Sequence, residues 1–278
     1  MTLQPLISAT IFRVAQRHPR SAALRRWGAS LLAIIAVAMH PTRAEVTQTI
    51  QAIKPAIVGI GTYQKTRSPS VQFLGTGFAV ADGLHVVTNA HVLPSALNAE
   101  SKEILIILAG AGKSPEPREA STIAIDDDHD LALLRIEGEP LPAVRLGDSG
   151  GIREGQSLFF TGYPIGTVLG LHPVTHRSMV SAITPIVLPS LHSKQLDEKM
   201  IKRLRAAPYM VFQLDAVAYP GNSGSPLYDP DNGKVYGIIN MVFVKGTKES
   251  ALSAPSGISY AIPANFIRNF LRSNNLLD

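Results

Sequence analysis

The sequence predicts an all-β fold built from many short strands. Short apolar runs recur along the chain, and turn-forming residues separate them. The 22 glycines and 20 prolines of the chain supply those turns. Several strands at short spacing are typical of a β-barrel or a β-sandwich. Cysteine is absent, so no disulfide staples the fold and its apolar cores must hold it together.

The predicted strands follow one another from residue 56 to residue 262. Each run is rich in apolar, β-branched or aromatic residues, which suit the pleated surface of a sheet. In chain order the runs cover residues 56–63, 72–80, 85–90, 103–108, 131–136, 157–161, 174–183, 209–214, 234–244 and 257–262.

Two segments have the periodicity of amphipathic helices instead. Residues 196–205 carry apolar side chains at 196, 200, 201 and 204, which fits one face of a helix. They belong to the interval 184–208, for which a solvated packing helix and a lid or docking surface are both open. Residues 264–277 predict a packing helix with Ile267, Phe270 and Leu271 facing inward.

Residues 1–44 have the organisation of a secretory signal peptide. They hold six arginines and no acidic residue, then an apolar run at 28–39, and they end in Ala44. That run is shorter than the roughly 20 residues that a membrane-spanning helix needs. We therefore predict cleavage after Ala44, no stable membrane span afterwards, and a periplasmic or secreted protein.

The net positive charge of the chain resides in this leader. The whole sequence has 26 basic and 21 acidic residues, for a net charge of +5. Without the six leader arginines, 20 basic residues face 21 acidic ones. The charge is thus no argument for a nucleic-acid partner, and no nucleic-acid motif accompanies it. No His, Asp or Glu cluster has metal-ligand spacing, so we predict no metal and no cofactor.

A glycine-rich turn at residues 219–227 carries Ser223 between two predicted strands. Glycines let the backbone turn sharply and let a substrate approach closely. They also free nearby N–H groups to point at one spot, as an oxyanion hole requires. An ordinary turn can have the same composition, so a functional interpretation depends on partners elsewhere in the chain.

Those partners precede Ser223 in an informative order. His91 closes one apolar run and Asp130 opens another, which gives the order His, Asp, Ser with gaps of 39 and 93 residues. One known arrangement of the Ser-His-Asp machinery runs in this order. Three motifs in suitable context are more specific than any one of them.

Three segments resemble the catalytic segments of trypsin-like serine proteases of the HtrA/Deg type. They read Thr-Asn-Ala-His-Val at 88–92, Asp-Leu-Ala-Leu-Leu at 130–134 and Gly-Asn-Ser-Gly-Ser at 221–225. The resemblance implies two packed six-stranded antiparallel β-barrels with a C-terminal helix. The expected domains are the signal peptide at 1–44, a first barrel at 45–148 and a second barrel at 149–278.

The resemblance also implies a role for each catalytic residue. Ser223 attacks the scissile carbonyl, His91 is its base, and Asp130 orients and stabilises the imidazole. The aspartates at 126–128 are rivals for the last role. Asp130 is preferred because it directly precedes the Leu-Ala-Leu-Leu run.

The oxyanion hole and the substrate pocket follow from the same resemblance. The hole is expected at Gly221, Asn222 and Ser223, with the backbone N–H groups of the first and last as donors. Neutral Asn222 cannot pair with a freshly cut N-terminus, so activation by propeptide cleavage is not expected. The pocket walls are apolar, which predicts cleavage after small or medium aliphatic residues. The substrate-binding residues are expected to be Val217, Ala218, Ile239, Asn240 and Met241.

The implied function is an exported serine endopeptidase that cleaves unfolded or damaged polypeptides. The sequence ends 15 residues after Pro263, so we expect a protease domain without the PDZ module of the HtrA group. The trimer of that group is an open expectation. One alternative is a catalytically silent trypsin-like fold that binds peptides or acts as a chaperone. Another is an esterase, although Ser225 stands where the Gly-x-Ser-x-Gly elbow needs its second glycine.

Overall fold

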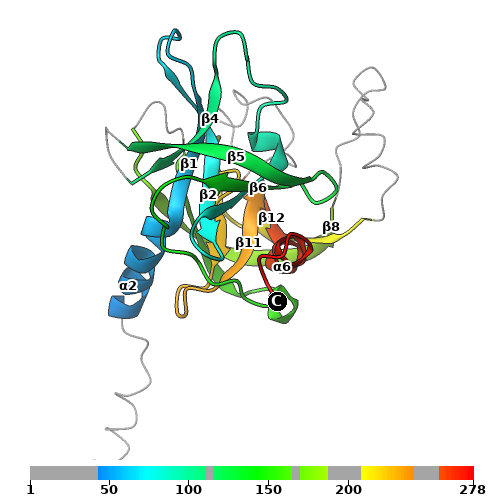
Figure 1. Ribbon diagram of the computed structural model, residues 1–278. Helices are drawn as coiled ribbons and strands as arrows, with labels where there is room; N and C mark the ends of the chain where they lie inside the picture. The colour runs from blue at the N-terminus through cyan, green and yellow to red at the C-terminus, as the bar shows by residue number, and fades with distance from the viewer. Residues whose placement is uncertain (1–42, 111–114, 165–169, 187–207, 241–256) are drawn as a thin grey trace, which may run out of the picture. The chain divides into compact units, whose positions relative to one another are not determined.

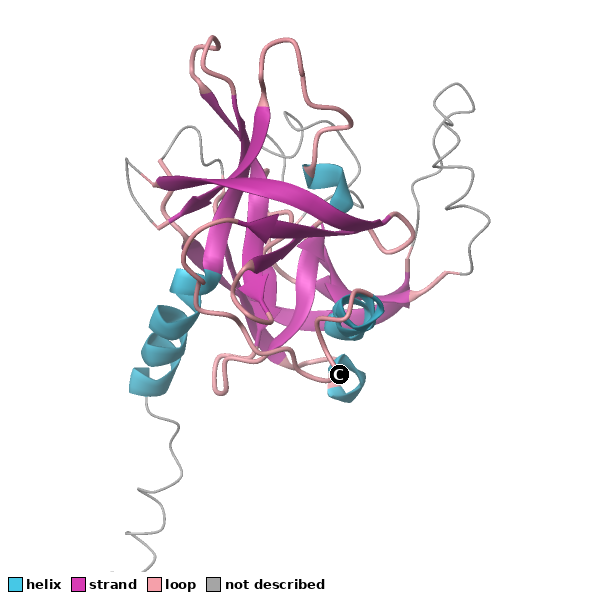
Figure 2. Ribbon diagram, in the orientation of Figure 1, coloured by secondary structure: helices cyan, strands magenta, loops and turns pink. Residues whose placement is uncertain are grey.

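The structure is a computed structural model that describes residues 43–110, 115–164, 170–186, 208–240 and 257–278. Within them the chain is mainly β-strand (Figure 2). The predicted cleavage point after Ala44 falls in α2 (Arg43–Ile53), and the leader before residue 43 lies outside the described residues. The helix predicted at 196–205 lies outside them as well. Among the described helices, none combines the length and apolar character that a membrane crossing requires.

Six antiparallel strands close the first barrel in the order β1-β2-β3-β6-β5-β4 (Figure 1). Apolar side chains from several of these strands, including Val58, Ile60, Ile107 and Leu134, form one buried cluster. The strands are β1 (Ile57–Tyr63), β2 (Val71–Val80), β3 (His85–Thr88), β4 (Ile104–Ala109), β5 (Glu116–Asp126) and β6 (Leu131–Ile136).

Six further strands close the second barrel in the order β10-β11-β12-β9-β8-β7, again with antiparallel pairing. Its buried cluster includes Leu158, Phe160, Phe212 and Ile239. The predicted architecture of two six-stranded barrels is confirmed. The strands are β7 (Ser157–Gly162), β8 (Val174–Pro185), β9 (Met210–Leu214), β10 (Pro226–Tyr228), β11 (Val235–Asn240) and β12 (Ser259–Pro263).

A third apolar cluster joins the two barrels. It combines Ile57 and Phe78 of the first barrel with Tyr228 and Ile262 of the second. Tyr163, which follows β7, crosses the same boundary, because its hydroxyl donates to the carbonyl oxygens of Ile57 (3.1 Å) and Gly110 (3.0 Å). Burial raises the pKa of Tyr163 to about 12, so the hydroxyl keeps its proton as a donor. The barrels are therefore held together by apolar packing and by buried hydrogen bonds.

The connection between the barrels is bonded to both of them. β6 ends at Ile136 and β7 begins at Ser157, so the division predicted between 148 and 149 falls in this connection. The N–H of Val144 donates to the carbonyl of Ala79 in β2 over 2.9 Å. Three residues later, the N–H of Gly147 donates to the carbonyl of Val235 in β11 over 2.8 Å.

The C-terminal helix α6 (Ala264–Ser273) follows β12 without a linker. Its buried face presents Ile267, Phe270 and Leu271, so the packing helix predicted from the sequence is confirmed. The helix ends at Ser273, and the hydroxyl of that residue donates back to the carbonyl of Phe270 over 2.9 Å.

The short strand β10 was not predicted from the sequence, and neither was strand β5. Only Ala120 in it is buried, and the exposed residues include Ile123 and Ile125. It has too few apolar residues to stand out as a run. Its place is fixed instead by pairing with β4 on one side and β6 on the other.

Candidate active site

Ser223 lies in the Ser223 loop (residues 219–225), which follows β9 and leads into β10. The N–H of Asn222 donates to the carbonyl of Tyr219 over 2.9 Å, which closes a β-turn. Gly221 is the third residue of this turn and has φ of +100°. A type II turn requires such a left-handed residue at this position. The orientation of the peptide between Pro220 and Gly221 is therefore set by the turn.

Thr76, on strand β2 of the first barrel, fixes the Ser223 loop of the second. Its N–H donates to the carbonyl of Ser223 over 2.9 Å, and its hydroxyl donates to the carbonyl of Gly221 over 2.6 Å. The contact is so close that a Cβ on Gly224 would lie 1.9 Å from the carbonyl oxygen of Thr76. Only glycine fits at residue 224, where φ is +88°.

His91 lies in a short 3-10 helix, Ala90–Val92, that comes almost directly after β3. Its Nδ1 is 2.6 Å from Oδ2 of Asp130, and its backbone N–H donates to Oδ1 of Asp130 over 2.9 Å. A carboxylate accepts, so Nδ1 carries the proton in this pair. The other ring nitrogen, Nε2, is thereby left as the basic one.

Asp130 is held in a left-handed backbone conformation, with φ of +53°, at the start of β6. Aspartate tolerates this region better than most residues do. Its carbonyl oxygen accepts from the N–H of Ala90 (3.1 Å) and from Nδ2 of Asn89 (3.0 Å). The residue is only 2% exposed. Backbone and carboxylate are both locked onto the segment that carries His91.

Asn240, at the end of β11, reaches Asp130 from the second barrel. Its Nδ2 donates to Oδ2 of Asp130 over 2.7 Å, and the residue is fully buried. The sequence analysis assigned Asn240 to the substrate pocket and missed this contact. The side-chain nitrogen is thus bonded to Asp130, and the substrate-binding role of Asn240 stays a prediction. No motif in the sequence signalled this bond, which joins residues 110 positions apart.

The Ser223 loop and the His91 helix approach each other across Gly75 of β2. A Cβ on Gly75 would lie 2.9 Å from Cγ1 of Val92 and 3.2 Å from the carbonyl oxygen of Ser223. Within the described residues, the Ser223 hydroxyl makes no hydrogen bond to His91 or to any other group. Catalytic hydrogen bonds are often long in unliganded enzymes and shorten when substrate binds.

Three backbone N–H groups of the Ser223 loop lack an acceptor among the described residues, and they belong to Tyr219, Gly221 and Ser223. The N–H groups of Asn222, Gly224 and Ser225 all donate to carbonyl oxygens. The N–H groups of Gly221 and Ser223 are the oxyanion donors predicted from the sequence. The Asn222 side chain is fully buried, and neither atom of its amide has a hydrogen bond in the described part of the chain.

The predicted substrate walls are only partly described. Ala218 and Ile239 are buried in one apolar cluster, and Val217 is half-buried. The N–H of Ala218 donates to the hydroxyl of Ser259 over 2.8 Å, which ties this wall to β12. Met241, the remaining wall residue, lies outside the described residues.

The aspartates at 126–128 do not contact His91 through any described hydrogen bond. Asp126 instead accepts from Nδ1 of His129 over 2.7 Å. In the described residues no group of three or more His, Cys, Asp or Glu side chains could hold a metal ion.

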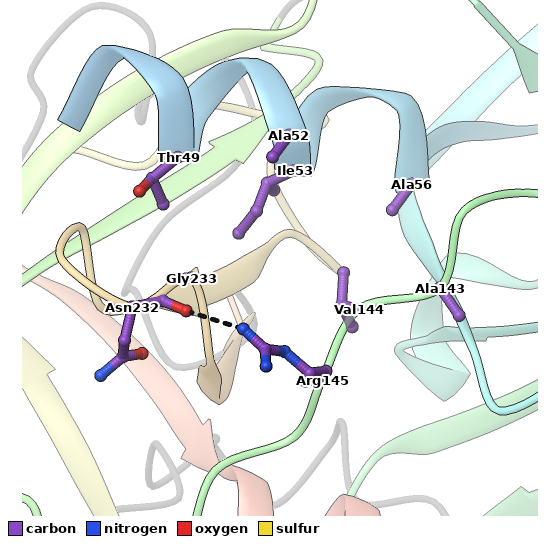
Figure 3. Close-up of a pocket in the computed structure, with 9 residues that line it drawn as sticks. All are labelled: Thr49, Ala52, Ile53, Ala56, Ala143, Val144, Arg145, Asn232 and Gly233. Atoms are coloured by element: carbon purple, nitrogen blue, oxygen red, sulfur yellow. Dashed lines mark hydrogen bonds between the residues drawn. The ribbon is translucent and has the colours of Figure 1, made fainter. Parts of the chain in front are cut away.

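A cavity of about 190 Å³ lies under α2, away from these residues (Figure 3). Its lining includes Thr49, Ile53, Val144 and Arg145, and the Arg145 guanidinium donates to the carbonyl of Asn232 over 3.3 Å. Arg145 is the one charged side chain of this lining. The cavity has no acid–base pair and offers no catalytic alternative to the His91–Asp130 pair.

The fold and the residues at the barrel boundary define the class of trypsin-like peptidases. The family model described as a trypsin-like peptidase domain matches residues 75–238, and the chain belongs to this family. The resemblance to HtrA/Deg-type proteases drawn from the sequence is confirmed by the relatives. One is a probable periplasmic serine endoprotease, DegP-like, of Pseudomonas fulva (strain 12-X). It is 27% identical over 86% of this chain and 52% of its own length.

Solved structures show the same fold. The HtrA-type protease AlgW with decapeptide has a TM-score of 0.58 and 22% identity, covering 82% of this chain and 66% of its own. The Rv3671c protease, inactive form, has a TM-score of 0.57 and 21% identity, covering 84% and 96%. The chain spans about half the length of the first curated relatives it matches.

Proposed function

We propose that the chain is a trypsin-like serine endopeptidase in which Ser223, His91 and Asp130 act as nucleophile, base and orienting carboxylate. The observation that carries the proposal is the His91–Asp130 pair, whose Nδ1 and Oδ2 atoms are 2.6 Å apart, beside a serine loop that the first barrel holds through Thr76. A buried aspartate on Nδ1 leaves Nε2 as the basic nitrogen, and a nucleophilic serine needs such a base.

The reaction begins when His91 Nε2 takes the proton of the Ser223 hydroxyl as Oγ attacks the scissile carbonyl. The peptide C=O becomes an oxyanion, and the N–H groups of Gly221 and Ser223 are the proposed donors to it. The imidazolium then gives its proton to the leaving amine, and an acyl-enzyme ester on Ser223 remains. Water attacks this ester with His91 again as the base, which releases the acid and restores the hydroxyl.

Asp130 stabilises the imidazolium in both steps. It is buried, and its two oxygens accept from His91 and from Asn240. A carboxylate with fixed donors needs no rearrangement when the positive charge develops on His91. The Asp130 carbonyl accepts from the N–H of Ala90 and from Nδ2 of Asn89, and these bonds keep the residue from turning away.

We infer that the substrates are unfolded or damaged polypeptides, cleaved after small or medium aliphatic residues. Ala218 and Ile239 provide an apolar wall with no acidic residue to attract Lys or Arg. Such a pocket distinguishes a single methylene by only about 1–3 kcal/mol, so cleavage should be broad. We also infer export through the leader at 1–44 and a periplasmic location, which the names of the DegP-like relatives support. The trimer stays a prediction that light scattering can test.

The experiment compares cleavage of unfolded casein by the wild type and by Ser223→Ala. A matched control is Ser225→Ala, because Ser225 is in the same loop and its buried hydroxyl has no hydrogen bond in the described residues. We expect cleavage by the wild type and by the control, and none by Ser223→Ala. Equal cleavage by all three proteins would refute the proposed nucleophile.

A catalytically silent, peptide-binding fold is the second candidate. The observation that favours it is the missing hydrogen bond between the Ser223 hydroxyl and His91. Binding of labelled unfolded casein without cleavage, equal in the wild type and Ser223→Ala, would support this candidate over the peptidase.

A further inference from the structure

The turn that carries Asp130 is closed by hydrogen bonds between Asp126 and His129. It connects β5 to β6, whose last pair is Asp126 with Leu131. Oδ1 of Asp126 accepts from the N–H groups of Asp128 and His129, each over 3.1 Å. Oδ2 of Asp126 accepts from Nδ1 of His129 over 2.7 Å. The carboxylate therefore holds three donors of the turn, and His129 supplies two of them.

Asp126 is charged in this arrangement. Burial alone would raise the pKa of Asp126, but hydrogen bonds from the His129 ring and backbone, and from Asp128, outweigh burial and hold that pKa below its ordinary value. A charged acceptor makes a stronger hydrogen bond than a neutral one. The turn is thus fastened more firmly than by an ordinary Asx turn.

The His129 ring also fastens the turn to the second barrel. It stacks on Phe266 of α6, with ring centroids 4.3 Å apart and an interplanar angle of 27°. It contacts Tyr209, next to β9, at 4.9 Å, and Tyr209 and Phe266 contact each other at the same distance. Two aromatic rings from two other segments therefore contact His129, the residue that directly precedes Asp130.

The backbone conformation of Asp130 depends on this turn being held in place. A non-glycine residue at φ of +53° is strained and persists only where its surroundings fix it. If the turn relaxed, the carboxylate would leave both the ring and the backbone N–H of His91. Hydrogen bonds from Asn89 and Ala90 to its carbonyl oxygen fix Asp130 on one side. On the other side, Asp130 is joined through its peptide bond to His129.

We propose that His129 is a positioning residue for Asp130, clamped by Asp126 in its own turn and by Phe266 and Tyr209 across the barrel boundary. This inference rests on the proposed role of Asp130 in the peptidase. His129 acts through Asp130 and does not touch the substrate.

The first barrel contains a second pair of the same geometry, which serves as the control. Nδ1 of His85 is 2.7 Å from Oδ1 of Asp82, again three residues apart and again in a turn between strands. The residue after His85 is Val86 in the barrel core, so this turn presents no candidate catalytic residue.

The test uses three purified variants. His129→Phe keeps an aromatic ring for the stack and removes Nδ1, Asp126→Asn removes the charge of the acceptor, and Asp82→Asn is the matched control. The readouts are kcat and KM for a peptide substrate, thermal unfolding, and the downfield proton resonance of the His91 Nδ1–H in the Asp130 hydrogen bond. The resonance is also recorded for each variant combined with Ser223→Ala, where no turnover occurs.

We expect His129→Phe and Asp126→Asn to lower kcat by about tenfold to a hundredfold, the cost of a small misplacement of a catalytic group. KM should stay as in the wild type, and the His91 resonance should shift or broaden. Asp82→Asn should leave kcat and the resonance as in the wild type, even where it lowers the melting temperature.

Three results would overturn the inference. One is unchanged kcat and unchanged resonance in both folded turn variants. Another is an equal loss in Asp82→Asn, which would reveal general loosening of the barrel. The third is a wild type without a downfield resonance, because Asp130 would then not hold His91. A wild type that hydrolyses nothing, but whose resonance still responds to His129→Phe, would refute the peptidase and leave the positioning role intact.

Discussion

Asn240 of β11 donates a hydrogen bond from Nδ2 to Oδ2 of Asp130, which lies at the start of β6 in the other barrel, with 2.7 Å between the two atoms. Both side chains are buried. The carboxylate that holds His91 is thus shared between the barrels. The geometry of the candidate site consequently depends on how the two barrels pack.

Replacing Asn240 by Ala should weaken catalysis. The change removes a donor to a buried carboxylate, and hydrogen bonds to charged groups contribute about 1.5–3 kcal/mol. We expect kcat/KM on a peptide substrate to fall at least about tenfold. The matched control is Asn265→Ala, which removes an amide–carboxylate bond to exposed Asp148. The control should keep its kcat/KM, and an equal loss in both variants would contradict the role of Asn240.

Replacing Gly224 by Ala should unfold the Ser223 loop. The added Cβ would lie 1.9 Å from the carbonyl oxygen of Thr76, at a residue with φ of +88°. The control Gly155→Ala has nearly the same φ, +84°, with no atom within 4 Å of the added Cβ. The control should lose about 1–3 kcal/mol in the free energy of unfolding. Gly224→Ala should lose more, as urea unfolding will measure, and similar losses would mean that Thr76 gives way.

Replacing Thr76 by Val should loosen the same loop without adding bulk. The Thr76 hydroxyl donates to the carbonyl of Gly221 and accepts from the N–H of Tyr163. Leaving these two buried groups unpaired should cost about 1–3 kcal/mol each in the free energy of unfolding. Hydrolysis should fall as well, because the proposed oxyanion donors lose their support. Thr122→Val, on the exposed face of β5, is the control and should behave as the wild type. Full activity in Thr76→Val would contradict this account of the loop.

His176 should make stability fall as the solution becomes acidic. Its ring stacks on Phe160 at 4.7 Å, and its Nε2 is buried without a hydrogen bond in the described residues. Burial lowers the pKa of His176 below its ordinary value. A histidine whose folded pKa is lowered contributes stability above its unfolded pKa, and loses it as pH falls toward the folded pKa. Below about pH 6.5 the unfolded chain binds a proton that the folded chain resists.

The variant His176→Phe keeps the stack and removes this titration. Denaturant unfolding between about pH 7.5 and 5 should show the wild type losing up to about 1.4 kcal/mol per pH unit more than the variant. Parallel pH profiles for the two proteins would show that His176 is not the cause.

Local patterns in the sequence were enough to predict most strands and the C-terminal helix. The apolar run at 131–136 is an example, because it is buried at all but one residue. The helix within 264–277 is another, because its buried residues repeat with the helical period. Strand β5 could not be found in this way, since its exposed residues leave no apolar pattern. Its position is decided by its neighbours β4 and β6.

The residues of the candidate site also fall into those that the sequence predicts and those that it does not. His91, Asp130 and Ser223 stand in short motifs with a recognisable order, so a single sequence suffices to nominate them. The sequence gives no sign of the contacts that Thr76 and Asn240 make, and these contacts span 145 and 110 positions of the chain. Only the packing of one barrel on the other brings them to their partners. The same holds for His129, whose ring contacts come from Tyr209 and Phe266.

The central claim is that Ser223 is a nucleophile activated by His91, and covalent labelling tests it most directly. Purified protein is treated with a serine-directed fluorophosphonate, digested, and the modified peptide is located by mass spectrometry, with Ser223→Ala and His91→Ala as comparisons. The account predicts one adduct on Ser223 in the wild type, none in Ser223→Ala, and strongly reduced labelling in His91→Ala. An unlabelled wild type, or an adduct on a serine other than Ser223, would contradict it.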